Sequence, residues 1–319
     1  MKILVITSEW PSKNYPNDVP FLVEHIQSLE KLVSEIKVVK VKIGSIWKYF
    51  QSINKINRIL KINNYNIIHT HWGWNGLIGC WFSLPHIITF HGSDLNLPVK
   101  WSIRNITIQF ISQLSSICTI KNIFVSSKLK NQAIIKSNKN EIIPIGLNLE
   151  KFKPMDKNEA RHILNIPLDK KVILFGGNES QPVKRVQFAK KAIKQLGEEY
   201  ALLTINYENH ENIPLYMNSA DALLMTSKSE GSPMMVKEAL ACNLPVVSTN
   251  VGDVKSMIDG LDNCHIIYDE SPNNIAKIVE KCISNRTIPN GRGTMINYSI
   301  DAIANQVYEV YKSVLGEAS

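Results

Sequence analysis

Short runs of apolar, β-branched residues alternate with longer segments of helical periodicity along most of this 319-residue chain. A helical segment between two short strands lets the second strand pair in parallel with the first. The alternation therefore predicts βαβ units, parallel sheets and helices on both faces of each sheet. Strands are expected at 2–7, 36–41, 66–71, 86–90, 123–127, 171–177, 200–207, 222–227, 245–250 and 265–269, and helices at 21–33, 183–197 and 298–315.

These elements fall into two series, separated by the stretch IIPIGLNLEKFKP at 142–154. Its turn residues and two prolines are typical of a linker. The chain is long enough for two medium domains. We therefore expect an α/β protein of two Rossmann-like domains, residues 1–148 and 149–300. A C-terminal helix at 301–319 is expected to pack back towards the first domain.

The composition is that of a soluble globular protein, with 44% hydrophobic and 20% charged residues. The five cysteines are odd in number and form no C-x-x-C pair, which favours reduced thiols over disulfides or a zinc site. The N-terminal segment lacks the apolar region of a signal peptide, and no apolar run reaches the length of a membrane span. A cytoplasmic location is expected.

Positive charge is concentrated in the first half of the chain. Residues 1–150 contain 17 lysines and arginines against 8 acids, and the remainder contains 19 against 20. This asymmetry indicates an anionic partner such as a membrane surface, nucleic acid or a phosphorylated acceptor, or simply a solvated basic surface. Segments 46–60 and 99–114 mix Trp, Phe and Ile with basic residues. They are either contacts to a membrane or a lipid-linked acceptor, or helices packed on the sheet.

The stretch SEGSPMMVKEALACNLPVV at 229–247 carries two glutamates, one on each side of a predicted helix start. Ser232 is a good N-cap, and Pro233 suits the first turn. The free N–H groups of Met234 and Met235 would then form a site for an anion or a hydroxyl oxygen.

Glu230 precedes that helix end, and Glu238 lies about one and a half turns inside it. Both can accept hydrogen bonds from ligand hydroxyls. This arrangement suits a sugar joined through phosphates to a ribose. Alternatively, acidic residues near a helix start are stabilised by the helix dipole alone, by about 0.3–1 kcal/mol each.

Two further motifs follow predicted strands. In FGGNESQPVKR (175–185), Gly176 and Gly177 allow close approach of the backbone to a ligand, and Lys184 and Arg185 could neutralise a diphosphate. The alternative is a solvated, basic helix start. In ITFHGSDLN (88–96), the histidine would lie at the carboxyl edge of the sheet, where ligands bind in such folds. This residue is His91, with His71 at a neighbouring strand end and Asp94 close by in sequence; either histidine could instead be purely structural.

Taken together, these motifs resemble those of retaining nucleotide-sugar glycosyltransferases of family four, which have the GT-B fold of two Rossmann-like domains facing across a cleft. Glu230 and Glu238 match the glutamates of the family's E-x7-E motif. The resemblance implies that Glu238 holds the ribose hydroxyls and that Glu230 contacts donor-sugar hydroxyls. It also implies that the amides of Ser232–Met235 reach the sugar and phosphates.

The resemblance also implies roles for the other two motifs. Gly176, Gly177 and Lys184 correspond to the family's phosphate-binding loop, and His91 corresponds to a histidine that faces the donor sugar. The sequence departs from the family at Asn178, Pro20 and Ser256, where arginine, glycine and glutamate are usual. Arg185 is expected to supply the charge missing at Asn178.

The function implied is that of a retaining hexosyltransferase in cell-surface polysaccharide synthesis. It would transfer a sugar from a UDP- or GDP-sugar to a hydroxyl of a glycan or lipid-linked acceptor. No obligatory cofactor is expected, and no metal, since a D-x-D motif is missing. Expected partners are the nucleotide sugar, the acceptor and an anionic membrane touched peripherally by the basic N-terminal domain at the inner face of the plasma membrane, but not nucleic acid.

Three alternatives remain beside this reading. A non-catalytic subunit with the GT-B fold is suggested by Pro20 and Asn178. A GT-B-fold nucleotide-sugar epimerase would share the donor pocket. A Rossmann oxidoreductase is disfavoured because no G-x-G-x-x-G follows the first strand. The sequence leaves the base, the sugar, the acceptor and the oligomeric state open.

Overall fold

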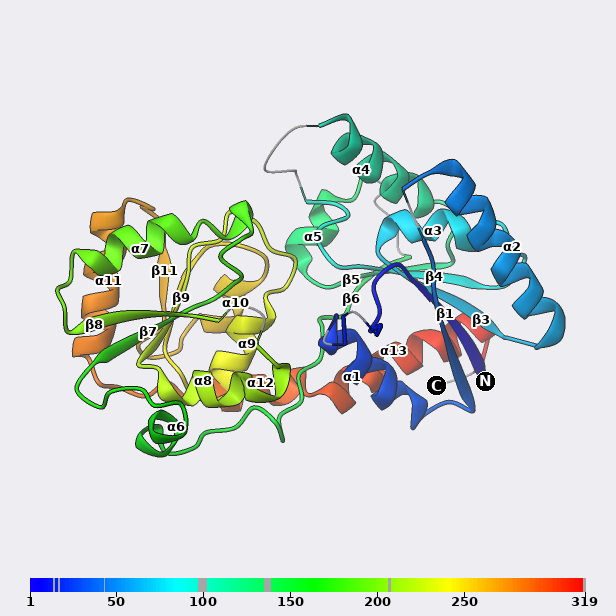
Figure 1. Ribbon diagram of the computed structural model, residues 1–319. Coiled ribbons are helices and arrows are strands. Elements are labelled where there is room, and N and C mark those ends of the chain that lie inside the picture. The colour runs from blue at the N-terminus through cyan, green and yellow to red at the C-terminus, as the bar shows by residue number, and fades with distance from the viewer. Residues whose placement is uncertain are drawn as a thin grey trace. The chain divides into compact units, whose positions relative to one another are not determined.

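The computed structural model describes residues 1–13, 15–16, 18–42, 44–96, 102–134, 139–205 and 208–317. The chain divides into two units. Unit 1 comprises Met1–Gly146 and Ile300–Ser319, and unit 2 comprises Leu147–Ser299. Each contains one parallel β-sheet with helices on both faces (Figure 1). Within the described part of the chain, no helix has the length and apolar character needed to cross a bilayer.

The sheet of unit 1 has six strands in the order β2-β1-β3-β4-β5-β6. The strands are β1 (Lys2–Thr7), β2 (Glu35–Lys40), β3 (Ile67–His71), β4 (His86–Phe90), β5 (Lys121–Phe124) and β6 (Asn140–Ile142). All neighbouring strands pair in parallel. The chain moves from β1 to β2 and then returns to the other side of β1, so the strand order reverses between β1 and β3. In such sheets a ligand binds beyond the carboxyl ends of the strands, at the reversal.

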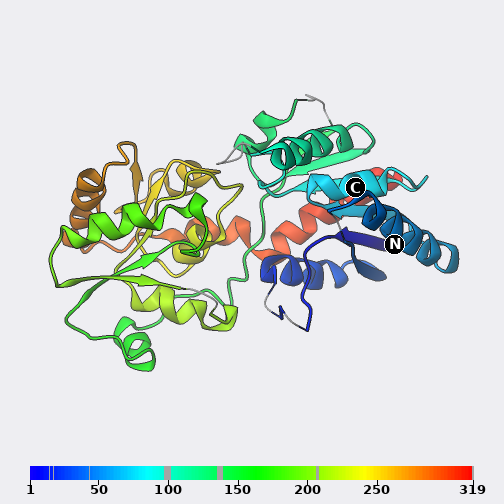
Figure 2. The same ribbon diagram turned by 45° about the horizontal axis from the view of Figure 1, so that its top comes forward.

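Two layers of helices cover this sheet (Figures 1 and 2). One layer contains α1 (Pro20–Glu30) and α13 (Ile300–Leu315), which share a core cluster with the strands. The other contains α2 (Ile46–Ile62), α3 (Gly73–Gly79), α4 (Ile103–Ser115) and α5 (Ser127–Gln132). Three of these begin at serines whose hydroxyls accept a backbone N–H, as good N-caps do.

The helix predicted at 298–315 is confirmed as α13, which buries one apolar face. Ile303, Val307, Val310 and Tyr311 all lie in the core of unit 1. Their spacing of three to four residues places them on one side of a helix. The last helix of the chain thus packs on the first sheet, with α1 as its neighbour.

Unit 2 has five parallel strands in the order β11-β10-β9-β7-β8. They are β7 (Lys171–Phe175), β8 (Tyr200–Thr204), β9 (Ala222–Met225), β10 (Val246–Thr249) and β11 (His265–Ile267). The helices are α6 (Lys157–Ile163), α7 (Val186–Lys194), α8 (Ile213–Ser219), α9 (Met234–Ala241), α10 (Val254–Ile258), α11 (Pro272–Ser284) and α12 (Gly291–Met295). Here the strand order reverses between β7 and β9.

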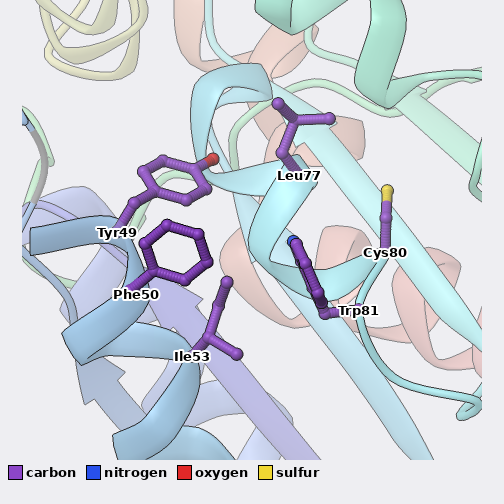
Figure 3. Close-up of a pocket in the computed structure, with 6 residues that line it drawn as sticks. All are labelled: Tyr49, Phe50, Ile53, Leu77, Cys80 and Trp81. Carbon is purple, nitrogen blue, oxygen red and sulfur yellow. The ribbon is translucent and has the colours of Figure 1, made fainter. Parts of the chain in front are cut away.

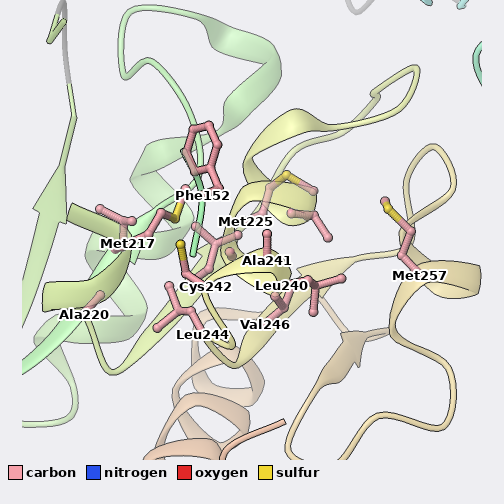
Figure 4. Packing of buried hydrophobic residues seen from close by; sticks show 14 of the residues in the cluster. Phe152, Met217, Ala220, Met225, Leu240, Ala241, Cys242, Leu244, Val246 and Met257 are labelled. Carbon is pink, nitrogen blue, oxygen red and sulfur yellow. The ribbon is translucent and has the colours of Figure 1, made fainter. Parts of the chain in front are cut away.

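The larger core cluster of unit 2 lies between its sheet and α8, α9 and α12. Figure 4 shows Met217, Leu240 and Val246 of this cluster packed with Phe152, all nearly free of solvent exposure. Burying such a side chain contributes about 1.5–3 kcal/mol. A second cluster covers the opposite face of the sheet, against α7 and α11. Because these strands are buried on both faces, their sequences are nearly continuous apolar runs.

Most predicted strands are confirmed, but several predicted boundaries were wrong by two or three residues. The strand predicted at 123–127 ends at Phe124, because Ser126 caps α5. The helix predicted at 183–197 begins only at Val186, since Arg185 has a left-handed φ of 54° that separates α7 from a short 3-10 turn. Strand β6 was not predicted, because it has only three residues and two of them are polar. The strand predicted at 200–207 ends at Thr204, and residues 206–207 lie outside the described residues.

Candidate active site

The loops after β7 and β9 in unit 2 bring two predicted site residues together. Lys184 follows β7, and Glu230 follows β9, the two strands that flank the reversal of strand order. The Nζ of Lys184 lies 2.7 Å from Oε1 of Glu230, and the side chains are 18% and 14% exposed. A charged pair therefore occupies the edge of the sheet where ligands of such folds bind.

Glycine at position 177 lets Lys184 lie against the backbone. A Cβ at Gly177 would come within 2.7 Å of Cδ of Lys184 and 2.9 Å of Cγ. Such contacts are too short for carbon atoms, so any side chain here would move the lysine. The neighbouring Gly176 is less crowded, since a Cβ there would lie 3.3 Å from Cβ of Met225.

Arg185 is occupied by contacts within the protein. Its guanidinium donates to the backbone carbonyls of Thr226 and Ser227, and it forms an ion pair with Glu270. The hydroxyl of Thr226 in turn donates to the carbonyls of Lys184 and Arg185. Arg185 therefore ties the start of α7 to the loop that follows β9.

The start of α9 differs from the prediction for Ser232 and Pro233. Pro233 occupies the N-cap position, and no side chain caps the helix there. The hydroxyl of Ser232 donates instead to Oδ2 of Asp253, 2.8 Å away, in the loop after β10. The N-cap prediction for Ser232 was wrong because a long-range carboxylate competes for that hydroxyl. Met234 and Met235 do lie in the first turn of α9, as expected.

Asp253, which accepts a hydrogen bond from the hydroxyl of Ser232, was not predicted as a candidate site residue. Burial raises the pKa of its carboxyl, while Lys237 and the Ser232 hydroxyl oppose that shift. The preceding Gly252 has a φ of 54°, and a Cβ there would come 2.8 Å from the carbonyl oxygen of Gly231. Only glycine fits this position. The sequence VGD directly after a strand was the available signal.

Glu238 lies in a separate cluster of unit 2. Its carboxylate is 5% exposed, and Oε1 lies 3.3 Å from Nε2 of His210. The Nδ1 atom of His210 is 2.8 Å from Nζ of Lys151. Because a lysine ammonium only donates, Nδ1 accepts, and the proton of a neutral His210 is on Nε2, directed at Glu238. Neither His210 nor Lys151 was predicted, because no local pattern links them to Glu238.

In unit 1, the predicted histidines at two strand ends form a pair. Nδ1 of His71, at the end of β3, lies 3.0 Å from Nε2 of His91, which follows β4. Burial lowers the pKa of His91 to about 3, so its ring is neutral. The other ring nitrogens, Nε2 of His71 and Nδ1 of His91, are buried and have no hydrogen-bond partner among the described residues. Such atoms are normally satisfied by water or a ligand.

Asp94 fixes the loop that carries His91. Its carboxylate is fully buried and accepts the backbone N–H groups of Gly73, His91 and Gly92 at 2.8–3.2 Å. On the inner side, His69 lies between the hydroxyls of Tyr311 and Thr89, at 2.7 Å from each. These contacts hold the pair of histidines in place. The sequence analysis did not single out His69, and Tyr311 was expected only as a packing residue of the C-terminal helix.

The three positions that depart from the family pattern have ordinary structural partners. Pro20 is the first residue of α1, after Val19 at a φ of 45°, which is strained for a β-branched residue. The side chain of Asn178 accepts from the backbone N–H and hydroxyl of Ser180. Ser256 donates to the backbone carbonyl of Asp253.

Comparison with known proteins identifies the class of this protein. Residues 2–151 match the family described as Glycosyltransferase Family 4, and residues 169–301 match Glycosyl transferases group 1. The chain superposes on sucrose-phosphate synthase from Thermosynechococcus elongatus with a TM-score of 0.81 at 16% identity, covering 100% of both chains. It also superposes on Anabaena Alr3699/HepE in complex with UDP and glucose, with a TM-score of 0.78 at 16% identity over 98% of this chain and 100% of that one. The fold is GT-B.

Curated relatives agree with this class. TuaC of Bacillus subtilis, a glycosyltransferase assigned to teichuronic acid biosynthesis, is 26% identical over 81% of this chain and 83% of its own. The UDP-Gal:alpha-D-GlcNAc-diphosphoundecaprenol alpha-1,3-galactosyltransferase of Escherichia coli is 22% identical over 84% and 80%. The chain belongs to the retaining family-four glycosyltransferases.

Proposed function

We propose that this protein transfers a sugar from a UDP- or GDP-sugar to a hydroxyl of a glycan or lipid-linked acceptor in cell-surface polysaccharide synthesis. The observation that carries the proposal is the ion pair of Lys184 and Glu230 at the reversal of strand order in unit 2. One partner suits a phosphate, and the other suits sugar hydroxyls.

The donor would be recognised by exchange of that ion pair. An incoming diphosphate offers Lys184 a doubly charged partner, and the freed carboxylate of Glu230 then accepts from sugar hydroxyls. The backbone N–H groups at Met234 and Met235 approach the phosphates, and Glu238 holds the ribose. His91 takes the role that the family resemblance gives it, a contact with the donor sugar.

During transfer, negative charge develops on the departing diphosphate. Lys184 and the N-terminus of α9 stabilise this charge, and preorganised groups of this kind contribute strongly to catalysis. We assign Arg185 a positioning role, because three contacts already engage its guanidinium. The acceptor hydroxyl attacks on the face that the leaving group vacates, and the anomeric configuration is retained.

The names of two relatives support the choice of substrates. One solved relative binds UDP and glucose, and one curated relative acts on a sugar linked to diphosphoundecaprenol. A lipid-linked acceptor also suits the basic N-terminal half of the chain, which would meet anionic lipid at the inner face of a membrane.

The proposal is tested by calorimetry with UDP and GDP, followed by transfer assays with a panel of nucleotide sugars. Micromolar binding of one nucleotide and turnover of its sugars are expected. An epimerase would convert the donor without any acceptor, and a non-catalytic subunit would turn over none. Either result would overturn the proposal.

We expect Glu238→Gln to weaken nucleotide binding by about tenfold to a hundredfold, since hydrogen bonds to a charged group contribute about 1.5–3 kcal/mol. Calorimetric titration of the nucleotide measures this loss. Glu280→Gln, on the exposed side of α11, serves as the matched control and should bind like the original protein. Equal affinities of the two variants would argue against a ribose contact at Glu238.

Gly177→Ala should lower kcat/KM by about tenfold to a hundredfold, because a group displaced by about 1 Å loses much of its catalytic effect. The added methyl group pushes on Lys184, 2.7 Å away, without filling the core. Gln187→Ala, at an exposed position of α7 outside the proposed site, is the control. Steady-state kinetics and thermal melts of both variants separate a displaced lysine from a folding defect. Identical kinetics for the two would contradict this reading.

A further inference from the structure

One segment of unit 1 is almost without negative charge. From residue 36 to residue 140 the sequence contains 14 lysines and arginines and a single acid, Asp94. Asp94 is fully buried and holds backbone N–H groups, so it adds no carboxylate to the surface. Glu141, just beyond the segment, is paired with Lys121. The surface built by this segment is therefore cationic.

The same segment exposes an unusual number of large apolar side chains. On α2, Trp47 is 76% exposed, and Trp81, just after α3, is 63% exposed. On α4, the exposed apolar residues follow one another at steps of three or four, which places them on a single outward side of the helix. They are Ile103, Ile106, Phe110 and Leu114, and the exposed Ile117 lies just beyond the end of the helix. We call the outward side of α2, α3 and α4 the α2–α4 face.

A pocket of about 450 Å³ opens on this face between α2 and α3. Figure 3 shows Tyr49, Phe50 and Ile53 on one side of it and Leu77, Cys80 and Trp81 on the other. The rings of Phe50 and Trp81 meet edge to face, with centroids 6.3 Å apart. The hydroxyl of Tyr49 is already engaged, since it donates to the carbonyl of Trp74. The pocket therefore offers an apolar lining.

We propose that the α2–α4 face docks on an anionic lipid bilayer and that the α2–α3 pocket takes a hydrocarbon chain of a lipid. Exposed Trp and Phe enter the interfacial region, and the surrounding Lys and Arg meet the anionic headgroups. A second copy of this chain is a poor partner, because two faces of the same positive charge repel each other. The membrane binding does not depend on the proposed function. Its biological role, which is to bring the protein to a lipid-linked acceptor, rests on that function.

The test is flotation of the purified chain with vesicles of phosphatidylcholine alone or with about 30% phosphatidylglycerol. Each basic residue near an anionic surface adds about 1 kcal/mol, or roughly fivefold, to binding. No nucleotide sugar is added, so failure of the transferase proposal would not affect the result. Binding to the anionic vesicles only, weakened by salt, is expected.

Two sets of substitutions separate charge from insertion. Replacing the exposed Lys48, Lys55 and Arg58 with glutamine should weaken binding roughly a hundredfold. The matched control replaces Lys191, Lys194 and Lys277, exposed bases of unit 2, and should have little effect. For insertion, the triple variant Trp47→Ser, Phe50→Ser, Trp81→Ser should bind anionic vesicles more weakly than the parent chain. The control combines Tyr268→Ser and Ile288→Ser, exposed apolar residues of unit 2, and should bind like the parent.

Quenching by lipids with brominated chains reports the depth of the tryptophans. The parent chain should be quenched more than the conservative variant Trp47→Phe, Trp81→Phe, which should still bind. Equal binding to neutral and anionic vesicles, no binding, or equal loss in the unit 2 controls would each overturn the proposal. The proposal would also be overturned if the chain formed a dimer in solution and only the substitutions on the α2–α4 face dissociated it. A second copy of the chain would then cover that face.

Discussion

Replacing Lys184 by alanine is expected to lower kcat by a factor of about a hundred to a thousand, the loss that follows removal of one preorganised donor to a developing negative charge. Lys184 is 18% exposed and lies at the edge of the sheet where the diphosphate is proposed to bind. A bound phosphate there has less water to spread its charge, so the missing ammonium is not replaced. Steady-state and single-turnover kinetics with the preferred donor measure this loss.

Lys190→Ala is the matched control, because Lys190 lies on α7 close in sequence and pairs with Glu179 at the surface. It should retain activity within about twofold, as expected for a surface ion pair that contributes little. Removing Lys184 also takes the ion-pair partner from Glu230, so melting temperatures are needed beside the kinetics. Glu230→Gln combined with Lys184→Ala restores charge balance. A double variant as active as the parent would contradict a role for Lys184 in the transfer.

Acid should unfold unit 1 well before it titrates most carboxylates. Five buried histidines of this unit have a lowered pKa, chiefly because burial disfavours their charged form: His25, His69, His71, His86 and His91. They stay neutral in the folded chain, whereas the unfolded chain protonates them below a pH of about 6.5. Stability is therefore complete above that pH and is lost as the pH falls towards the folded values, about 4 for His25 and about 3 for His86 and His91.

The expected loss is large. Each such histidine can cost up to about 1.4 kcal/mol per pH unit, so several together approach the roughly 5–15 kcal/mol stability of a typical domain. Denaturant unfolding at pH 7.5, 6.5 and 5.5 measures the slope. His25→Leu should reduce the slope of unfolding free energy against pH by about a fifth, because the slope scales with the number of histidines that titrate on unfolding. His162→Leu, exposed on α6, should not change it. A stability that is flat from pH 7.5 to 5.5 would show that these histidines are charged in the folded chain.

Strand positions were predictable because both faces of each sheet are buried. Each strand is therefore a short apolar run that is recognisable in the sequence. Strand β6 was not predictable, because three residues with an asparagine and a glutamate give no such run. The break before α7 was not predictable either. It depends on the left-handed backbone conformation of Arg185, and an arginine in the sequence gives no sign of that conformation. The motif around Glu230 and Glu238 stood out locally, since glycine, proline and glutamate at fixed spacing carry a physical meaning of their own.

The kind of fold, two parallel sheets, and the neighbourhood of the candidate site follow from local patterns in the sequence. Periodicity and turn residues act over a few positions, and a single chain displays them directly. The identity of the side chains that come into contact depends on the three-dimensional packing of the chain. Lys184 and Glu230 are 46 positions apart, and His210 and Glu238 are 28 apart. The hydroxyl of Ser232 donates to Asp253, 21 positions away, and does not cap the helix that follows it. Such pairs depend on strand order and on which strand ends share an edge, and these follow from how the whole chain packs.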